Sequence, residues 1–410
     1  MRLSAVGIFA VAPLAALLAC GDNPPPATAD SGTTDVGGYV FAGSDPVQPL
    51  AGIFVRLGGT QAVTDANGFF TIPAAPSSYD LLVEDVPARA FTSFVGLTRR
   101  DPHLQIASSL PPDVWSAHVT VTSALASPGQ RVVLVATDPT QGAALMSATP
   151  DGKGGATVAW AGPYSFTADM NALVFQTDAM GSPVKYVGFG WQSVSLANGQ
   201  DAVSSIELSP PVTGNLAIST TLPQGYGVPT LSATVDFGTG GTPEELAIWS
   251  GVPASGVLVP LIPGLRMSFQ GTSIHGADIS VAFSGPLPLD TSAGTATLAF
   301  PSAAKLSSPA DGAVGVEVST SFAWQTSTVA RFTAKPARPN SPSYSVVTAA
   351  RSCSLPDTSL LGAPLPGAAS YVWQVETFPG APSTDSYADP AFVPTVNSSA
   401  LTGSRTFVTR

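Results

Sequence analysis

The chain has 410 residues, a formal net charge of −11 and only 10% charged residues, against roughly 25% in ordinary soluble proteins. The lack of a Lys/Arg cluster argues against nucleic acid as a partner, because nothing would neutralise the phosphates. A hydrophobic content of 44% argues against a wholly disordered chain, and 40 glycines with 39 prolines favour short antiparallel strands separated by turns. The sequence therefore predicts an all-β protein of roughly two to four domains.

Residues 1–19 have the pattern of a secretory signal peptide. Arg2 supplies the positive charge, and the apolar run from Val6 to Ala19 is about 14 residues long, shorter than the roughly 20 residues of a spanning helix. The run ends in LLACG at positions 17–21, which resembles the lipobox of bacterial lipoproteins. The resemblance implies cleavage before Cys20 and a diacylglycerol on its thiol. The alternative is a plain signal peptide followed by a chance cysteine.

Residues 20–35 are expected to form the lipidated cysteine and a flexible tether. The segment is rich in Pro, Gly, Thr and Asp and has almost no apolar residue, so it cannot bury a core. Acyl chains contribute about 0.8 kcal/mol per buried methylene, so two or three of them on Cys20 would hold the chain on a membrane. Gly21 stands where an Asp would signal inner-membrane retention. The expected location is therefore the bacterial cell envelope, with the outer membrane favoured.

The segment 36–109 is expected to form the first β-sandwich. Strands are predicted at 36–41, 53–57, 61–64, 69–72 and 79–83 from alternation and turn signals. Their order resembles the carboxypeptidase regulatory-like (prealbumin-like) domain, which implies a packing role and no catalysis. The matching residues are Gly38, Pro49, Leu50, Gly52, Val55, Leu57, Thr64, Asp65, Gly68, Phe70, Ile72, Tyr79 and Leu81. Ser77 and Ser78 depart from the pattern, in which a glycine precedes the tyrosine.

The sequence DANG, from Asp65 to Gly68, is predicted to join two strands as a tight hairpin. It also looks like half of a calcium loop. A complete loop needs a bidentate Glu at its twelfth position, where this chain has Pro76. No metal is therefore expected here.

Two further sandwiches are predicted at 110–210 and 211–304, separated by proline pairs at 111–112 and 210–211. A single large sandwich over both halves remains the alternative. The expected strands are 118–122, 131–137, 157–160, 173–177, 186–194 and 204–208, then 214–220, 231–237, 246–249, 257–261, 266–270, 278–283 and 295–300.

Four aromatic residues of this region form a candidate carbohydrate platform: Trp160, Tyr164, Trp191 and Trp249. Stacking on sugars requires several rings exposed on one surface. Core packing is the favoured interpretation, because sandwich cores commonly hold a tryptophan or two.

The segment 305–410 resembles a fibronectin type III-like domain of bacterial surface proteins. The matching residues are Pro309, Asp311, Gly312, Ala313, Val316, Trp324, Tyr371, Trp373, Val375, Phe407 and Thr409. Alternation places Tyr371, Trp373 and Val375 on one buried face. The proline-rich stretch between Ala330 and Ser343 is predicted to be a loop.

No motif of a known catalytic site is present. The SxxK match Ser302–Lys305 lies at a predicted domain seam, and the acidic pair Glu244-Glu245, with Asp236 nearby, is interpreted as a solvated turn. With Cys20 lipidated, the exported chain would have no disulfide. Cys353 is expected to be buried and inert, because the histidines at 103, 118 and 275 are scattered.

The sequence thus favours a non-enzymatic, membrane-anchored protein without a cofactor, whose sandwiches serve as a binding or spacer surface. Its expected partners are the membrane, through the lipid on Cys20, and polysaccharide or envelope proteins. The alternative is a carbohydrate- or cell-wall-binding accessory module, and a secreted hydrolase is the third, less favoured hypothesis.

Overall fold

The computed structural model describes residues 34–42, 48–107, 115–121, 130–138, 144–150, 155–161, 163–237, 244–290, 294–326, 328–339, 341–392 and 397–410. The leader, Cys20 and the tether up to residue 33 lie outside these residues. The described chain consists mainly of β-strands, most of them paired antiparallel, with one short α-helix and one 3-10 turn. The predicted all-β class, with tandem sandwiches, is confirmed.

The first segment folds as two facing sheets. Its strands are β1 (Thr34–Ala42), β2 (Gln48–Pro49), β3 (Phe54–Leu57), β4 (Thr60–Val63), β5 (Phe69–Ala75), β6 (Tyr79–Asp85), β7 (Ala90–Leu97) and β8 (His103–Ile106). One sheet is β2-β1-β5 with β8 on the other side of β1, and the other follows β4-β3-β6-β7. Alternate residues such as Val36 and Val40 are fully buried between the sheets, as the alternation along the sequence predicts.

The DANG turn is tight, but the predicted hairpin is wrong. The Asp65 carboxylate accepts the backbone N–H groups of Asn67 and Phe69 at 2.8 and 2.9 Å, and Gly68 has a φ of +73°. However, β4 pairs with β3 and β5 pairs with β1. The turn therefore carries the chain from one sheet of the sandwich to the other.

Most strands in the middle of the chain lie close to the predicted positions. The strands of this region are β9 (Trp115–Val121), β10 (Gln130–Thr137), β11 (Ala144–Pro150), β12 (Gly155–Ala161), β13 (Ser165–Thr177), β14 (Pro183–Ala197), β15 (Asp201–Ser204), β16 (Val212–Thr221), β17 (Thr230–Asp236), β18 (Glu244–Ser250), β19 (Val257–Leu261), β20 (Arg266–His275), β21 (Asp278–Phe283), β22 (Leu287–Pro288) and β23 (Thr295–Ala299). Strands β11 and β22 were not predicted. The strand expected at 204–208 is misplaced, because β15 ends at Ser204.

The β10-β13-β14 sheet lies between two hydrophobic cores. Leu134 and Val174 point into the core that the sheet shares with β9 and β12. Val133 and Leu173 point the opposite way, into the core built by β16–β23. A sheet buried on both faces needs near-continuous apolar strands, which explains the run of residues 132–136. The two halves of this region are therefore joined by a shared sheet.

The last segment forms a sandwich around an aromatic core. Its elements are β24 (Lys305–Ser308), β25 (Ala313–Val316), β26 (Phe322–Gln325), β27 (Val329–Pro336), β28 (Ser343–Thr348), β29 (Ser352–Cys353), η1 (Ser359–Leu361), β30 (Ser370–Phe378), α1 (Thr384–Tyr387), β31 (Ser399–Leu401) and β32 (Arg405–Thr409). The predicted burial of Tyr371, Trp373 and Val375 is confirmed. The loop expected from residue 330 to 343 is wrong in its first half, where β27 runs between β28 and β30.

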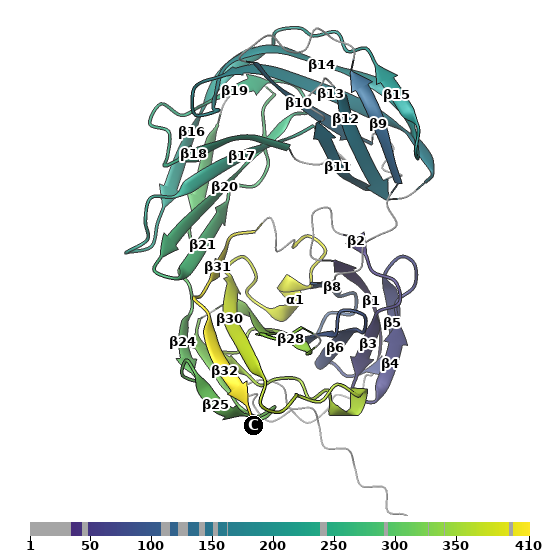
Figure 1. Cartoon of the computed structure of the whole chain (residues 1–410), viewed down its shortest axis with the longest axis vertical. Helices are drawn as coiled ribbons and strands as arrows, with labels where there is room; N and C mark the ends of the chain where they lie inside the picture. The colour runs from purple at the N-terminus through teal and green to yellow at the C-terminus, as the bar shows by residue number, and fades with distance from the viewer. Residues whose placement is uncertain are drawn as a thin grey trace, which may run out of the picture.

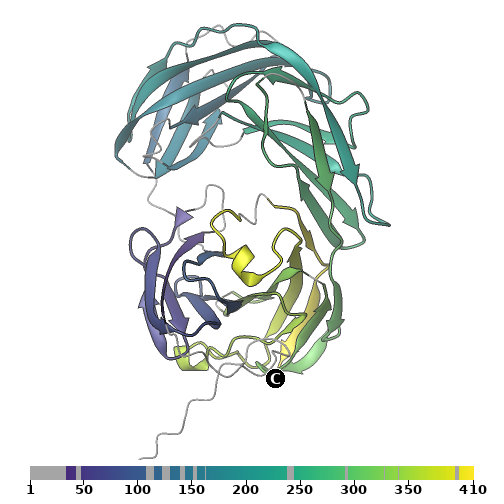
Figure 2. The same ribbon diagram turned by 180° about the vertical axis from the view of Figure 1, so that it is seen from behind.

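The two ends of the chain build one body. Strand β7 of the first segment pairs in parallel with β28 of the last, from Ala90 opposite Ser343 to Phe94 opposite Val347. The sheet continues through β30 and β31 into β21 of the middle region. Figures 1 and 2 show the result: the first and last segments lie together as a lower body, and the described residues between 115 and 300 form an upper body.

Asp385 of α1 fastens the first segment to the last. Its carboxylate accepts the N–H groups of Thr98 and Arg99 at 2.8 and 3.0 Å and also the Thr98 hydroxyl. Arg99 in turn donates to the Asp389 carboxylate at 3.0 Å. The structure thus closes the lower body with polar contacts between residues 286 to 290 positions apart in the chain.

We expect this junction to weaken in acid. Partial burial alone would raise the pKa of Asp385, but the hydrogen bonds from Thr98 and Arg99 outweigh it and hold the pKa below its ordinary value. A depressed carboxyl pKa gives stability that is present above the ordinary pKa of about 4 and is lost as the pH falls through the folded value. Urea unfolding between pH 6 and 3 should show the wild type losing more stability below pH 4 than Asp385→Asn. An identical pH dependence in both proteins would contradict this.

Candidate binding groove

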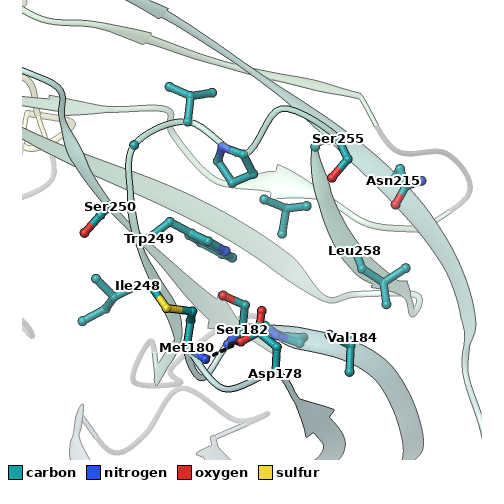
Figure 3. Close-up of a pocket in the computed structure, with 16 residues that line it drawn as sticks. Asp178, Met180, Ser182, Val184, Asn215, Ile248, Trp249, Ser250, Ser255 and Leu258 are labelled. Carbon is teal, nitrogen blue, oxygen red and sulfur yellow. Dashed lines mark hydrogen bonds between the residues drawn. The ribbon is translucent and has the colours of Figure 1, made fainter.

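A groove with a cavity volume of about 490 Å³ opens on the upper body, beside strand β18 (Figure 3). Its walls come from the β13–β14 turn, from β18 and the loop after it, and from β16 and β19. Trp249 lies among the labelled side chains in Figure 3, with Met180 and Ile248 on one side and Asn215 and Ser255 on the other. The groove therefore combines an indole with aliphatic and polar groups, and its lining includes the carboxylate of Asp178.

Asp178 fixes the backbone of the β13–β14 turn beside the groove. Its carboxylate accepts the N–H groups of Met180 and Ser182 at 2.8 and 2.9 Å. Gly181 supplies the positive φ, +86°, that closes the turn. Because these bonds fix the backbone, the Met180 side chain points outward and is 75% exposed.

Strand β18 forms the second wall and ends the large sheet at this side. Among the described strands β18 pairs with β17, with Trp249 opposite Leu231. Arg131 of β10 donates to the carbonyl oxygens of Glu245 and Leu246, both at 3.0 Å. Ile248 remains 48% exposed. The wall is thus fixed at the N-terminal end of β18. At the other end Ile248 is exposed, whereas Trp249 is half-buried and packs partly against the core.

The loop after β18 depends on Gly256. This residue has a φ of +75°, and an added Cβ would lie 2.6 Å from the Leu216 carbonyl oxygen. The close approach brings the loop residues 252–255 over β16 and places Ser255 near Asn215 at the rim in Figure 3. The chemistry of this set is non-covalent: stacking on the indole, apolar contact with Met180 and hydrogen bonds from the hydroxyl and amide groups.

The four aromatic candidates do not form one platform. Trp160 is fully buried and donates to the Pro163 carbonyl at 2.8 Å, as core packing predicts. Tyr164 and Trp191 are 55% and 58% exposed, so for them the core interpretation is wrong. Trp249 alone of the four lines the groove. Met180 and Asn215 were missed, because a lone methionine in a turn carries no sequence signal of binding.

The acidic pair lies on a strand and not on the predicted turn. Glu244 and Glu245 begin β18. Burial raises the pKa of Glu244 to about 7, although nearby Arg131 lowers it, while Glu245 is exposed. Two successive strand residues point to opposite faces, so this pair does not form a carboxylate couple.

The other residues considered for catalysis lie apart. Cys353 is buried in β29, as expected, and the three histidines lie on β8, β9 and β20. Ser302 precedes β24 and Lys305 begins it, without a helix between them. Within the described ranges no group of three His, Cys, Asp or Glu is arranged to hold a metal ion. Cys20 lies outside the described residues.

No protein-family profile matches the chain, and no curated protein matches it. Among solved structures it is similar to the Bacillus anthracis TIE protein, with 13% identity and a TM-score of 0.16 over 65% of this chain and 50% of that one. A pilus adhesin, SpaC from Lactobacillus rhamnosus GG, gives 12% identity and a TM-score of 0.13 over 66% and 43%. Domains 4–9 of the surface layer protein SbsC give 11% identity and a TM-score of 0.12 over 92% of this chain and 65% of that one.

The chain thus spans half or less of the length of the first two neighbours. Within the described residues no helix has the length and apolar character needed to span a bilayer.

Proposed function

We propose that the chain is a lipid-anchored protein of the bacterial cell envelope that presents its upper body as a non-enzymatic binding surface. The observation that carries the proposal is the placement of the two ends. Thr34 begins β1 in the lower body and the chain also ends there, whereas the groove lies in the upper body. An anchor at Cys20 would therefore leave the groove on the side away from the membrane.

The anchor is tested by growing cells with an alkyne fatty acid and comparing the wild type with Cys20→Ser. We expect labelled protein in the membrane fraction for the wild type and unlabelled, soluble protein for the variant, because two or three acyl chains are needed for stable attachment. Protease treatment of intact cells then reports whether the upper body is exposed. Equal labelling of both proteins, or none of either, contradicts the proposal.

The second candidate function is carbohydrate binding, and it is favoured by Trp249 in the groove. Truncating the indole removes the stacking surface, so Trp249→Ala should weaken retention on purified peptidoglycan by about tenfold. Because the indole is half-buried, thermal unfolding of the variant is measured alongside. A control is Trp191→Ala, which removes an exposed indole away from the groove residues. Equal retention of the folded Trp249→Ala protein and the wild type would remove this candidate.

A further inference from the structure

A cluster of aromatic rings lies on the outward face of the β5-β1-β8 sheet. Side chains alternate along β1, so that Val40 is buried in the core while Tyr39 and Phe41 are partly exposed on the opposite face. The strand register places Phe69 of β5 and His103 of β8 directly beside Tyr39. These four residues are called the aromatic face below.

The rings of the aromatic face form one continuous surface. The Tyr39 ring centre lies 5.1 Å from that of Phe69 and 5.0 Å from that of His103. The plane of Phe41 lies within 20° of Tyr39 and within 28° of His103. A Cβ on Gly37 would lie 3.2 Å from the Phe69 ring, so the missing side chain lets this ring lie against β1. These partly exposed rings offer an apolar surface on which a flat ligand can stack.

Gln105 adds a hydrogen-bond donor that has no acceptor. Its neighbours Leu104 and Ile106 point into the core, so Gln105 lies on the same face as His103, directly opposite Phe41. The side chain is only 8% exposed, and within the described part of the chain its amide nitrogen has no hydrogen-bond partner. A buried donor without an acceptor is unfavourable and is explained where a ligand or water supplies the missing oxygen.

We propose that the aromatic face and Gln105 together bind a neutral pyranose unit of a polysaccharide. A pyranose has an apolar C–H face that can lie on the rings and hydroxyl oxygens at its edge that can accept from the Gln105 amide. This site belongs to the lower body and is separate from the groove. It depends neither on the lipid anchor nor on the function proposed for Trp249.

The charges around His103 agree with a neutral ligand. Burial lowers the pKa of His103, Arg99 lowers it further, and Asp101 and Asp389 oppose the change. The lowered pKa favours the neutral form of the imidazole. Arg99 itself is engaged by Asp101 and Asp389, so it offers no free cation to an acidic sugar.

The test is native electrophoresis of the full chain carrying Cys20→Ser, in gels containing hydroxyethylcellulose, laminarin or glycogen, with sedimentation on purified peptidoglycan in parallel. We expect retardation or sedimentation by at least one of these. Tyr39→Ala with Phe41→Ala should weaken it by about tenfold or more, and Trp191→Ala should leave it unchanged.

Gln105→Leu separates a binding role from a structural one. It removes an unsatisfied buried amide, so the folded protein should be at least as stable by thermal unfolding, yet retention should fall. The proposal is overturned if the wild type is retained by none of the probes, or if either aromatic-face or Gln105 variant is retained like the wild type. Loss of retention in Trp249→Ala alone would assign the sugar to the groove instead. Size-exclusion chromatography gives one more contrary outcome. The proposal is also overturned if the wild type is a dimer that the double variant Tyr39→Ala with Phe41→Ala dissociates, and if the wild type is not retained by any sugar.

Discussion

Trp373→Ala should lower the free energy of unfolding of the lower body by about 3–5 kcal/mol, the range for truncating a buried large aromatic residue. The Trp373 side chain is fully buried. Its ring centre lies 5.3 Å from that of Phe322 and 5.8 Å from that of Phe332, and the Arg405 guanidinium lies over the ring at 5.8 Å. Alanine would leave a cavity at the centre of this cluster. Urea unfolding followed by far-UV circular dichroism measures the loss.

The matched control for this variant is Val372→Ala, one residue earlier on the same strand. Val372 points away from the core and is 38% exposed, so its truncation should change the stability by less than about 1 kcal/mol. The first unfolding transition is compared, because a chain with two bodies does not unfold in one step. Similar losses in the two variants would contradict the packing described for β30.

Gly190→Ala should destabilise the upper body by about 3 kcal/mol, at the upper end of the usual cost of overpacking. Strand β14 is crossed by the segment 206–209, and Phe189 exchanges backbone hydrogen bonds of 2.8 and 2.9 Å with Ser209. A Cβ on Gly190 would lie 2.0 Å from the carbonyl oxygen of Glu207. Because that neighbour is backbone, it cannot rotate away, and the crossing must open.

Gly59→Ala is the control for this second prediction. Gly59 lies between β3 and β4, and an added Cβ there meets nothing within 4 Å. Thermal unfolding of the two variants is measured first, and hydrogen exchange of the β14 amides is measured next. Only Gly190→Ala should show a large loss of stability and faster exchange. If Gly190→Ala unfolds like the wild type, the segment 206–209 does not lie against β14 as described.

Local features of the fold could be predicted from the sequence, and long-range pairings could not. The alternation of Tyr371, Trp373 and Val375 places them on one face whatever the partner strand, so it predicts burial directly. The pairing of β7 with β28 places Phe91 opposite Tyr344. The periodicity of either strand does not indicate which strand is its partner. The same holds for DANG: its residues specify a tight turn, but the destination of the next strand depends on β1.

The groove shows the same limit. Trp249 was a candidate from its residue type alone, but its neighbours Met180 and Asn215 come from other strands and turns. Their proximity depends on the sheet shared by the two halves of the middle region. Gln105 could not be identified from the sequence either. A polar residue in an apolar strand points to a binding site only once the structure shows that its buried amide nitrogen lacks a hydrogen-bond partner among the described residues.

The parallel pair β1–β8 has a mechanical consequence for a tethered protein. Tension from the proposed N-terminal anchor would enter β1 at Thr34, and tension from the upper body would enter β8 beyond Ile106. The two strands run in the same direction and are bonded side by side, with the Gly37 and Tyr39 amides donating to Arg100 and Pro102 at 2.9 Å. Opposite pulls therefore slide the strands lengthwise, so the bonds bear load together instead of breaking one by one. Such a shear arrangement would let the lower body resist drag on the upper body.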